Sequence, residues 1–205
     1  MVDCIRRRFH MQRVGHGGTL DPAATGLLIL LLGTATRQAQ HLLEADKTYF
    51  ATLRLGISTD TQDGEGTVLE NREVGSISAE RIEAASQKFR GAIQQETPAY
   101  SAARVQGRRS YELARAGLPV PRRIRQVTVR ELTILDVRLP EIDLKVICSK
   151  GTYIRTLCSD LGSALGVGGH LARLRRVQIG PFSVEKALPP ESCRPEDILP
   201  VDRLS

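Results

Sequence analysis

Cysteine is scarce in this 205-residue chain, and no Cys-x-x-Cys pair occurs. The four cysteines are Cys4, Cys148, Cys158 and Cys193, and none is spaced with a histidine as in a zinc site. Cys148 and Cys158 lie in apolar segments, so we expect them to fill the core. The pattern predicts reduced thiols, a cytoplasmic location and a protein without a bound metal.

Long hydrophobic runs are also absent. The longest one covers residues 27–32, far too few to span a bilayer and too far along the chain for a signal peptide. The sequence contains neither the G-x-x-x-x-G-K-[ST] nor the G-x-G-x-x-G pattern, which argues against binding of nucleoside triphosphates or dinucleotides. We therefore expect a soluble protein that makes no membrane contact.

The composition is that of a globular protein, with 41% hydrophobic and 25% charged residues. Lysine and arginine number 29 against 23 acidic residues, and the net charge is +6. Arginine supplies most of the positive charge, and its guanidinium group suits phosphate oxygens and stacks on bases. The charge balance favours RNA as a partner, although many basic surfaces bind nothing specific.

Hydrophobic spacing predicts several elements along the chain. Helices are expected near residues 2–9, up to residue 43, from Ser78 to Gly91, from Ser110 to Gly117 and around residues 154–161. Strands are expected at residues 47–55, 127–139 and 142–149, and a turn at residues 56–66 leads to a return strand near Val68. Residues 171–179 form a final basic and apolar element, and the proline-rich tail is irregular.

The expected helices and strands are interspersed without a regular βαβ alternation. This order predicts an α+β fold with a central, mainly antiparallel or mixed sheet flanked by helices.

A glycine-rich loop carries the most distinctive residues, and it ends in one carboxylate. Its sequence is Gly15-His16-Gly17-Gly18-Thr19-Leu20-Asp21-Pro22. Glycines let the backbone turn tightly and approach a ligand closely. Taken alone, Asp21-Pro22 would be read as an ordinary turn before a helix.

This loop, continued by Ala23-Ala24-Thr25-Gly26, resembles the catalytic motif of TruB-type pseudouridine synthases. Further blocks that resemble the family follow in the expected order across nearly the whole chain. They are Lys47-Thr48-Tyr49, then Pro98 with Tyr100-Ser101-Ala102, Gly107 and Tyr111, then residues 149–156 with Gly151-Thr152-Tyr153-Ile154-Arg155, and finally Leu174-Arg175-Arg176.

The resemblance implies the pseudouridine synthase fold and an enzyme that isomerises uridine 55 in the T-loop of transfer RNA. Such enzymes detach the uracil, turn it and rejoin it through C5 without a cofactor. By resemblance, Asp21 is the catalytic carboxylate, acting on the sugar or base as a nucleophile or on a ribose proton as a base. The residues leave the choice among these mechanisms open.

The resemblance also assigns roles around Asp21. Arg155 is the expected cation that keeps this carboxylate ionised. Tyr49 stacks on the flipped uracil, although a strand tyrosine is ordinarily a core residue. Tyr153 and Leu174 line the uracil pocket, and His16 fills the space that the flipped nucleotide leaves.

Several arginines are candidates for phosphate contacts, although each alone is a common solvated charge. These candidates are Arg6, Arg7, Arg8, Arg104, Arg108, Arg109, Arg173, Arg175 and Arg176. The expected partner is the T-arm of tRNA, bound by a monomer without an obligatory protein partner.

The match departs from the family at both ends. Relatives begin with a segment that contains a Lys-Pro dipeptide and forms a first strand, so we expect an N-terminally truncated catalytic domain at residues 1–185. Residues 186–205 are expected to be a tail, with no room after Leu204 for the RNA-binding PUA domain of many relatives.

Two other functions remain open. The chain could be an RNA-binding module that has lost catalysis, or a synthase that modifies ribosomal RNA with guide factors. A hydrolase is disfavoured because no second carboxylate stands at motif spacing from Asp21.

Overall fold

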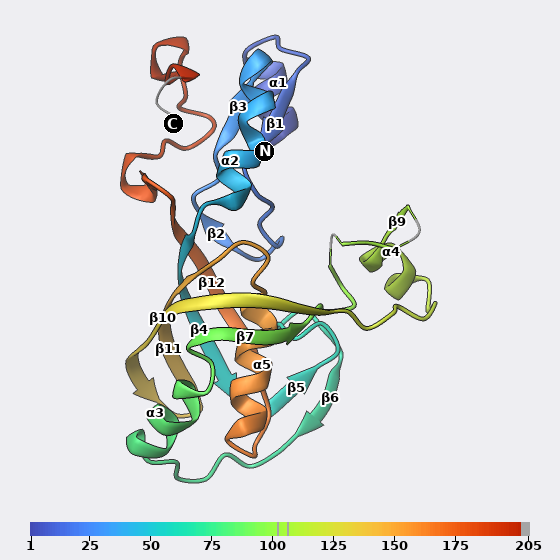
Figure 1. Ribbon diagram of the computed structural model, residues 1–205, viewed down its shortest axis with the longest axis vertical. Helices are drawn as coiled ribbons and strands as arrows, with labels where there is room; N and C mark the ends of the chain where they lie inside the picture. The colour runs from blue at the N-terminus through green and yellow to red at the C-terminus, as the bar shows by residue number, and fades with distance from the viewer. Residues whose placement is uncertain (102, 106, 202–205) are drawn as a thin grey trace. The chain divides into compact units, whose positions relative to one another are not determined.

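The structure is a computed structural model that describes residues 1–101, 103–105 and 107–201. Ala102, Leu204 and the side chain of Arg104, which the sequence interpretation names, lie outside the described part. The chain forms two compact units, Met1–Tyr49 with Arg175–Ser205 and Phe50–Leu174. The boundaries fall within two strands, β4 (Lys47–Leu55) and β12 (Gly169–Ile179) (Figure 1).

The first unit is built from short elements around a small apolar core. Its elements are α1 (Val2–Arg8), β1 (Val14–His16), β2 (Thr25–Gly26), β3 (Leu30–Leu32), the 3-10 helix η1 (Gly33–Gln38), α2 (Ala39–Glu44), β13 (Phe182–Ser183), and the 3-10 helices η2 (Val184–Lys186) and η3 (Pro195–Asp197). Leu27, Leu31, Leu42 and Ile179 form the buried cluster. In α1, Ile5 is buried and the three arginines of its last turn are exposed, as the predicted amphipathic pattern requires.

The second unit contains the main sheet. Its strands follow the order β12, β4, β11 (Glu141–Cys148), β10 (Ile124–Arg138) and β7 (Gly91–Glu96). The pairs β10–β11 and β10–β7 are antiparallel. The remaining elements are β5 (Ile57–Thr59), β6 (Val68–Asn71), α3 (Ala79–Gln87), β8 (Arg104–Val105), β9 (Arg108–Arg109), α4 (Ser110–Arg115) and α5 (Ile154–Ala164).

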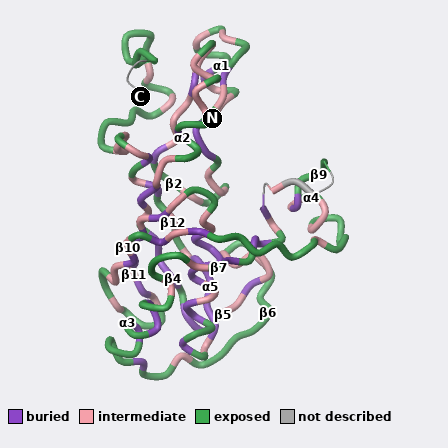
Figure 2. The backbone as a smooth tube through the Cα atoms, viewed as in Figure 1, coloured by how far each residue is buried: buried purple, intermediate pink, exposed green. Residues whose placement is uncertain are grey.

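Alternating side chains explain why the sheet strands form here. In β11 every second residue is buried, namely Ile142, Leu144, Val146 and Cys148. The strand therefore presents one apolar face to the core, which is the expected period of two. The sheet and α5 contain much of the buried backbone of this unit (Figure 2).

Helix α5 packs its apolar stripe against the same unit. Ile154, Leu157 and Leu161 are buried, and they recur at helical spacing. The helix contacts both α3 and β7. Ser78 caps α3 by accepting a hydrogen bond from the Arg81 amide, which confirms the predicted start of that helix.

The α+β class is confirmed, and so are the strands predicted near residues 47–55, 127–139 and 142–149. The helical stretch predicted up to residue 43 is also present, as the 3-10 helix η1 followed by α2. Two details of the prediction were wrong. The return strand β6 pairs with β5, which lies inside the predicted turn, and strand β7 was missed altogether.

No helix in the described part of the chain is both long and apolar enough to cross a membrane. Among the same residues, no group of three or more His, Cys, Asp or Glu side chains is arranged to hold a metal ion.

Candidate functional site

The glycine-rich motif forms a loop between two paired strands of the first unit. Strand β1 pairs antiparallel with β3, so that Val14 faces Leu32 and His16 faces Leu30. The Gly17 amide extends this ladder by donating to the Ile29 carbonyl at 2.9 Å. Residues 18–28 therefore form a loop of the first unit whose two ends are held by the pairing of β1 with β3.

Gly17 and Gly26 occupy positions where a side chain would collide with neighbouring atoms. A Cβ at Gly17 would lie 2.6 Å from Leu42 Cδ1, and one at Gly26 would lie 2.1 Å from the Arg176 carbonyl oxygen. Gly26 also has a φ of +101°, which disfavours other residues. These glycines are required for close packing of the loop on α2 and β12.

Asp21 begins a tight turn within this loop and is half-buried. The Ala24 amide donates to the Asp21 carbonyl at 2.9 Å. Pro22 follows Asp21, and its fixed φ favours this position of a turn. The predicted Asp-Pro turn is thus present, and it lies in a loop whose ends are held.

His16 is exposed at the end of β1. Its Nδ1 accepts a hydrogen bond from the Gly18 amide at 3.3 Å. An acceptor Nδ1 means that the neutral ring carries its proton on Nε2. The imidazole is therefore oriented by the loop that carries Asp21.

Arg176 is buried beneath the loop, with only 1% of its surface exposed. Its guanidinium group donates to the carbonyls of Leu27, Thr19 and Gly18 at 2.9, 3.2 and 3.1 Å. The prediction that Arg176 contacts phosphate was wrong, because its donors already bind backbone carbonyls inside the protein. By contrast, its neighbour Arg175 is exposed on the alternate face of β12.

Tyr49 lies at the unit boundary in β4, two residues after a buried lysine. Lys47 Nζ donates to the carbonyls of Leu42, Leu43 and Ala45 at 3.0, 2.6 and 2.6 Å. These carbonyls belong to the C-terminal end of α2, where a cation is favourable. Tyr49 itself is partly buried.

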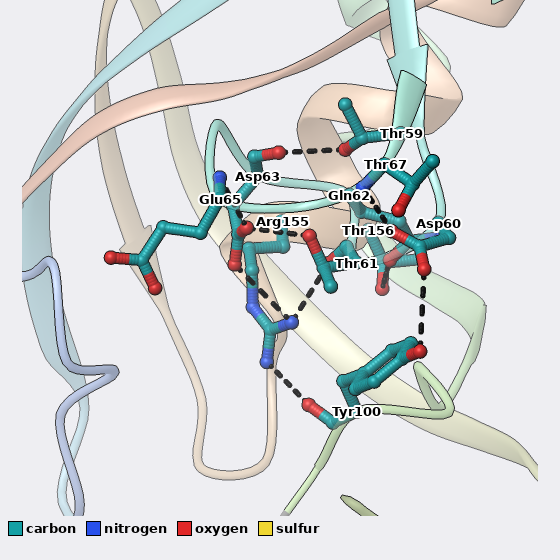
Figure 3. A network of polar contacts seen from close by, with 10 residues as sticks. All are labelled: Thr59, Asp60, Thr61, Gln62, Asp63, Glu65, Thr67, Tyr100, Arg155 and Thr156. Carbon is teal, nitrogen blue, oxygen red and sulfur yellow. Dashed lines mark hydrogen bonds and ion pairs between the residues drawn. The ribbon is translucent and has the colours of Figure 1, made fainter. Parts of the chain in front are cut away.

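Arg155 lies in the first turn of α5 in the second unit and is 5% exposed. Its guanidinium group donates to the carbonyls of Thr61 and Tyr100 at 2.8 and 2.9 Å, and Nη1 lies 3.6 Å from Asp63 Oδ2. Figure 3 shows these groups converging on the guanidinium group from the loop after β5 and from the segment at Tyr100.

The loop at residues 59–67 is rigidified by its own acidic side chains. Asp63 Oδ1 accepts bonds from the Thr61 hydroxyl at 2.6 Å and from the Glu65 amide at 3.1 Å. Asp60 accepts from the Thr67 amide at 2.7 Å and from the Tyr100 hydroxyl at 3.2 Å. Burial, with Asp60 as the second cause, raises the pKa of the Tyr100 phenol.

Tyr153 immediately precedes α5 and is fixed through its backbone. The Gln95 side chain accepts from the Tyr153 amide at 2.7 Å and donates to the Tyr153 carbonyl at 2.9 Å. Gln95 is 2% exposed on β7. This reciprocal pair sets where α5 begins and hence where Tyr153 and Arg155 lie.

Family comparisons agree with the order of these segments. Residues 6–154 match the family model described as TruB family pseudouridylate synthase (N terminal domain). The chain belongs to the TruB family. Residues 155–191 match a second model, described as tRNA pseudouridylate synthase B C-terminal domain.

Curated TruB relatives are similar to most of the chain. The protein named tRNA pseudouridine synthase B from Chromohalobacter salexigens is 50% identical over 181 residues, which is 88% of this chain and 59% of that protein. The protein of the same name from Burkholderia pseudomallei is 50% identical over 183 residues, covering 89% and 60%. The chain thus spans about 60% of the length of these relatives.

Solved structures support the pseudouridine synthase fold. A chain from a Cbf5-Nop10-Gar1 complex matches with a TM-score of 0.68 at 32% identity, covering 89% of this chain and 45% of that chain. A chain from an H/ACA RNP bound to a substrate RNA containing 2′-deoxyuridine matches with a TM-score of 0.67 at 29% identity, covering 91% and 45%.

The TruB motif residues fall into two groups in the structure. Asp21, His16 and Tyr49 belong to the first unit. Arg155 and Tyr153 belong to the second, as does the partly buried Leu174 of β12. Within each unit the motif residues are held by backbone contacts, and the pairing of Asp21 with Arg155 stays a prediction.

Sequence reasoning missed two residues that hold these motifs and gave a third the wrong role. Asp63 contacts the Arg155 guanidinium group and Gln95 contacts the Tyr153 backbone, whereas Arg176, expected at phosphate, binds the Asp21 loop. The run of Thr, Asp and Gly at residues 59–67 could have signalled a structured loop. Nothing in the sequence around Gln95 marks it as a buried residue.

Proposed function

We propose that this chain is the catalytic part of a tRNA pseudouridine synthase that isomerises uridine 55 in the T-loop, with Asp21 as the catalytic carboxylate. One observation carries the proposal: the only carboxylate of the TruB motif stands on a loop with fixed ends, in a chain 50% identical to proteins named tRNA pseudouridine synthase B. Residues 1–185 are the proposed catalytic domain.

The reaction needs a carboxylate and no redox partner. The C1′–N1 bond of uridine breaks, a C1′–C5 bond forms, and in the product the proton of C5 is replaced by one on N1. Asp21 in its ionised form can attack the sugar or base, or remove a ribose proton. Each route requires the Asp21 carboxylate to be directed at the nucleoside, and a loop with fixed ends favours such an orientation.

Arg155 is the proposed cation that favours the ionised form of Asp21. Two carbonyl oxygens fix its guanidinium group, so the charge does not have to be oriented during the reaction. Tyr153 and Leu174 are the proposed walls of the uracil pocket. The Gln95 contacts support this role for Tyr153, because they hold its backbone.

The remaining two motif residues, Tyr49 and His16, have proposed roles in base flipping. Tyr49 is the proposed stacking partner of the extruded uracil, a contact worth about 1–3 kcal/mol. His16 is exposed and oriented by Gly18, which suits a ring that fills the vacated position in the RNA stack. The net charge of +6 favours attraction of the tRNA phosphates.

The decisive experiment incubates the purified chain with an unmodified tRNA transcript and detects pseudouridine by carbodiimide labelling and primer extension. Asp21→Asn is expected to lower the rate by at least about 10³-fold, because the amide is neither a nucleophile nor a base. Asp136→Asn is the matched control, since Asp136 is an exposed carboxylate on β10. Product formed by Asp21→Asn at the wild-type rate contradicts the assignment.

Two alternatives have distinct outcomes in the same assay. Binding of tRNA without product by the wild-type chain supports an RNA-binding module instead. Product that requires added protein and guide RNA supports a guided synthase, the setting suggested by the H/ACA structural relative. We also propose a cytoplasmic monomer, for which size-exclusion chromatography should give a mass near 22.5 kDa.

A further inference from the structure

Arg176 holds the loop of Asp21 on both sides of the carboxylate. On the N-terminal side, its guanidinium group donates to the carbonyls of Gly18 and Thr19. On the C-terminal side, its Nε donates to the Leu27 carbonyl at 2.9 Å, and its own carbonyl accepts from the Leu27 amide at 2.7 Å. One residue thus fixes two segments that flank Asp21.

The strand that carries Arg176 adds a third constraint. Residues Thr25 and Gly26 pair in parallel with Arg175 and Arg176. A Cβ at Gly26 would lie 2.1 Å from the Arg176 carbonyl oxygen, so only glycine permits this approach. Between the two fixed segments only residues 20–24 remain, and the turn from Asp21 to Ala24 occupies them.

Arginine is the residue type that this arrangement requires. The three acceptors are carbonyls of Leu27, Thr19 and Gly18, and each is bound by a different guanidinium nitrogen. A planar fork of donors can bind all three, whereas a lysine ammonium presents its donors from one atom and cannot place a separate nitrogen at each carbonyl. The 1% exposure of Arg176 leaves it no role in contacting a ligand directly.

We propose that Arg176 is the positioning residue for Asp21. This inference rests on the proposed function of Asp21 and adds how the carboxylate is oriented. The guanidinium group keeps the backbone at Gly18 and Thr19 in place, and this backbone sets the direction of the Asp21 side chain. Loss of the clamp therefore lowers the rate of the chemical step and leaves RNA binding unchanged.

The test compares Arg176→Lys and Arg176→Met with the wild-type chain. Tritium release from a tRNA transcript labelled at uridine C5 gives kcat and KM separately. Misplaced catalytic groups lose rate on the order of 10²-fold, so we expect kcat to fall by about this factor in Arg176→Met and by less in Arg176→Lys. KM is expected to stay within about twofold because no phosphate contact is removed.

Two controls separate positioning from general stability. Ile179→Val removes a methylene from the buried core of the same strand and keeps the Arg176 contacts, so its kcat should equal the wild-type value. Arg90→Lys alters another arginine that donates to a carbonyl, that of Leu132, in the other unit. An equal fall of kcat in Ile179→Val, or a rise of KM alone in the Arg176 variants, overturns the proposal.

Amide hydrogen exchange tests the clamp independently of activity. Exchange at residues 18–24 should increase in both Arg176 variants and remain at the wild-type rate in Ile179→Val and Arg90→Lys. Unchanged exchange at these residues refutes the clamp even if the wild-type chain is inactive. An inactive wild-type chain with increased exchange in the variants refutes the proposed function and leaves the clamp standing.

Discussion

Backbone carbonyl oxygens receive most of the hydrogen bonds from the buried cations of this chain. Lys47 and Arg176 each donate to three carbonyls, and Arg155 donates to two in addition to facing Asp63. Such carbonyls lie in loops and at a helix end, where they lack a partner in a regular ladder. The cations satisfy them, which offsets part of the desolvation cost of a buried charge.

Asp63 should stabilise the position of Arg155. In the wild type, Asp63 Oδ2 lies 3.6 Å from Arg155 Nη1. Asp63→Asn replaces the carboxylate with a neutral amide, and in one orientation of that amide its NH2 group faces Nη1, so that two hydrogen-bond donors oppose each other. The remaining oxygen can keep the bonds from Thr61 and the Glu65 amide. We expect the free energy of unfolding to fall by about 1–3 kcal/mol, measured by urea denaturation.

Glu65→Gln is the matched control for this change. Glu65 is exposed in the same loop and contributes its backbone amide to Asp63. Its substitution should alter stability by less than about 0.5 kcal/mol. An equal loss of stability in both variants would show that the Asp63 carboxylate has no specific role.

At the scale of elements, α5 and β7 each contribute a carboxylate to their contact, Asp160 from α5 and Glu96 from β7. Burial raises the pKa of Asp160 to about 6, and the Glu96 carboxylate adds to this effect. Glu96 in turn lies 3.4 Å from the Arg122 guanidinium group, which neutralises part of its charge. Asp160 therefore titrates where most carboxylates are already ionised.

This raised pKa predicts a pH-dependent loss of stability. Between about pH 4 and 6 the folded chain binds more protons at Asp160 than the unfolded chain does, so the free energy of unfolding decreases as the pH rises through this range. Asp160→Asn should remove this slope. It should also stabilise the protein at pH 7.5, because no partly buried charge is then present at this position, and solvent screening of a partly exposed group limits the gain to about 1–2 kcal/mol. Urea denaturation across this pH range measures both effects.

The control for Asp160 is Asp136→Asn, which removes an exposed carboxylate from β10. It should leave the decrease between pH 4 and 6 in place. A decrease of the same size in Asp160→Asn would mean that another group causes it.

Element prediction succeeded where side chains alternate and failed where a polar residue is buried. The apolar residues of β11 recur at every second position, and this period identified the strand. In β7 the buried residue is Gln95, whose partner is the Tyr153 backbone 58 residues away. A local pattern of hydrophobic residues contains no information about such a partner.

The same limit applies to the candidate site. Motif residues such as Asp21 and Arg155 were found because a contiguous run of sequence carries them. Arg176 was assigned to solvent because a charged residue in a basic segment is ordinarily exposed. Its burial depends on carbonyls 149 to 158 residues earlier in the chain, which no local reading could supply.

At the scale of the whole molecule, the excess of positive charge should govern RNA affinity. The logarithm of the tRNA binding constant should decrease linearly with the logarithm of salt concentration, with a slope of about −0.7 to −0.9 for each phosphate neutralised. Arg175→Gln should make this slope less steep by about one phosphate, because Arg175 is exposed on β12. Fluorescence anisotropy with labelled tRNA measures both slopes.

Arg90→Gln serves as the control in this titration, since Arg90 already pairs with Glu83 at 2.8 Å. Its slope should equal that of the wild-type chain. Equal slopes for Arg175→Gln and the wild type would remove Arg175 from the phosphate contacts.

The contact between Arg176 and Leu27 has a consequence for biosynthesis, because the two residues are 149 positions apart. At about 5–20 residues per second, a ribosome needs roughly 7–30 s to make the intervening chain. During that interval the segment bearing Asp21 has left the ribosome without the residue that clamps it. The loop that carries Asp21 therefore cannot complete its hydrogen bonds to Arg176 until late in synthesis, although the sequence of that loop is translated near the start.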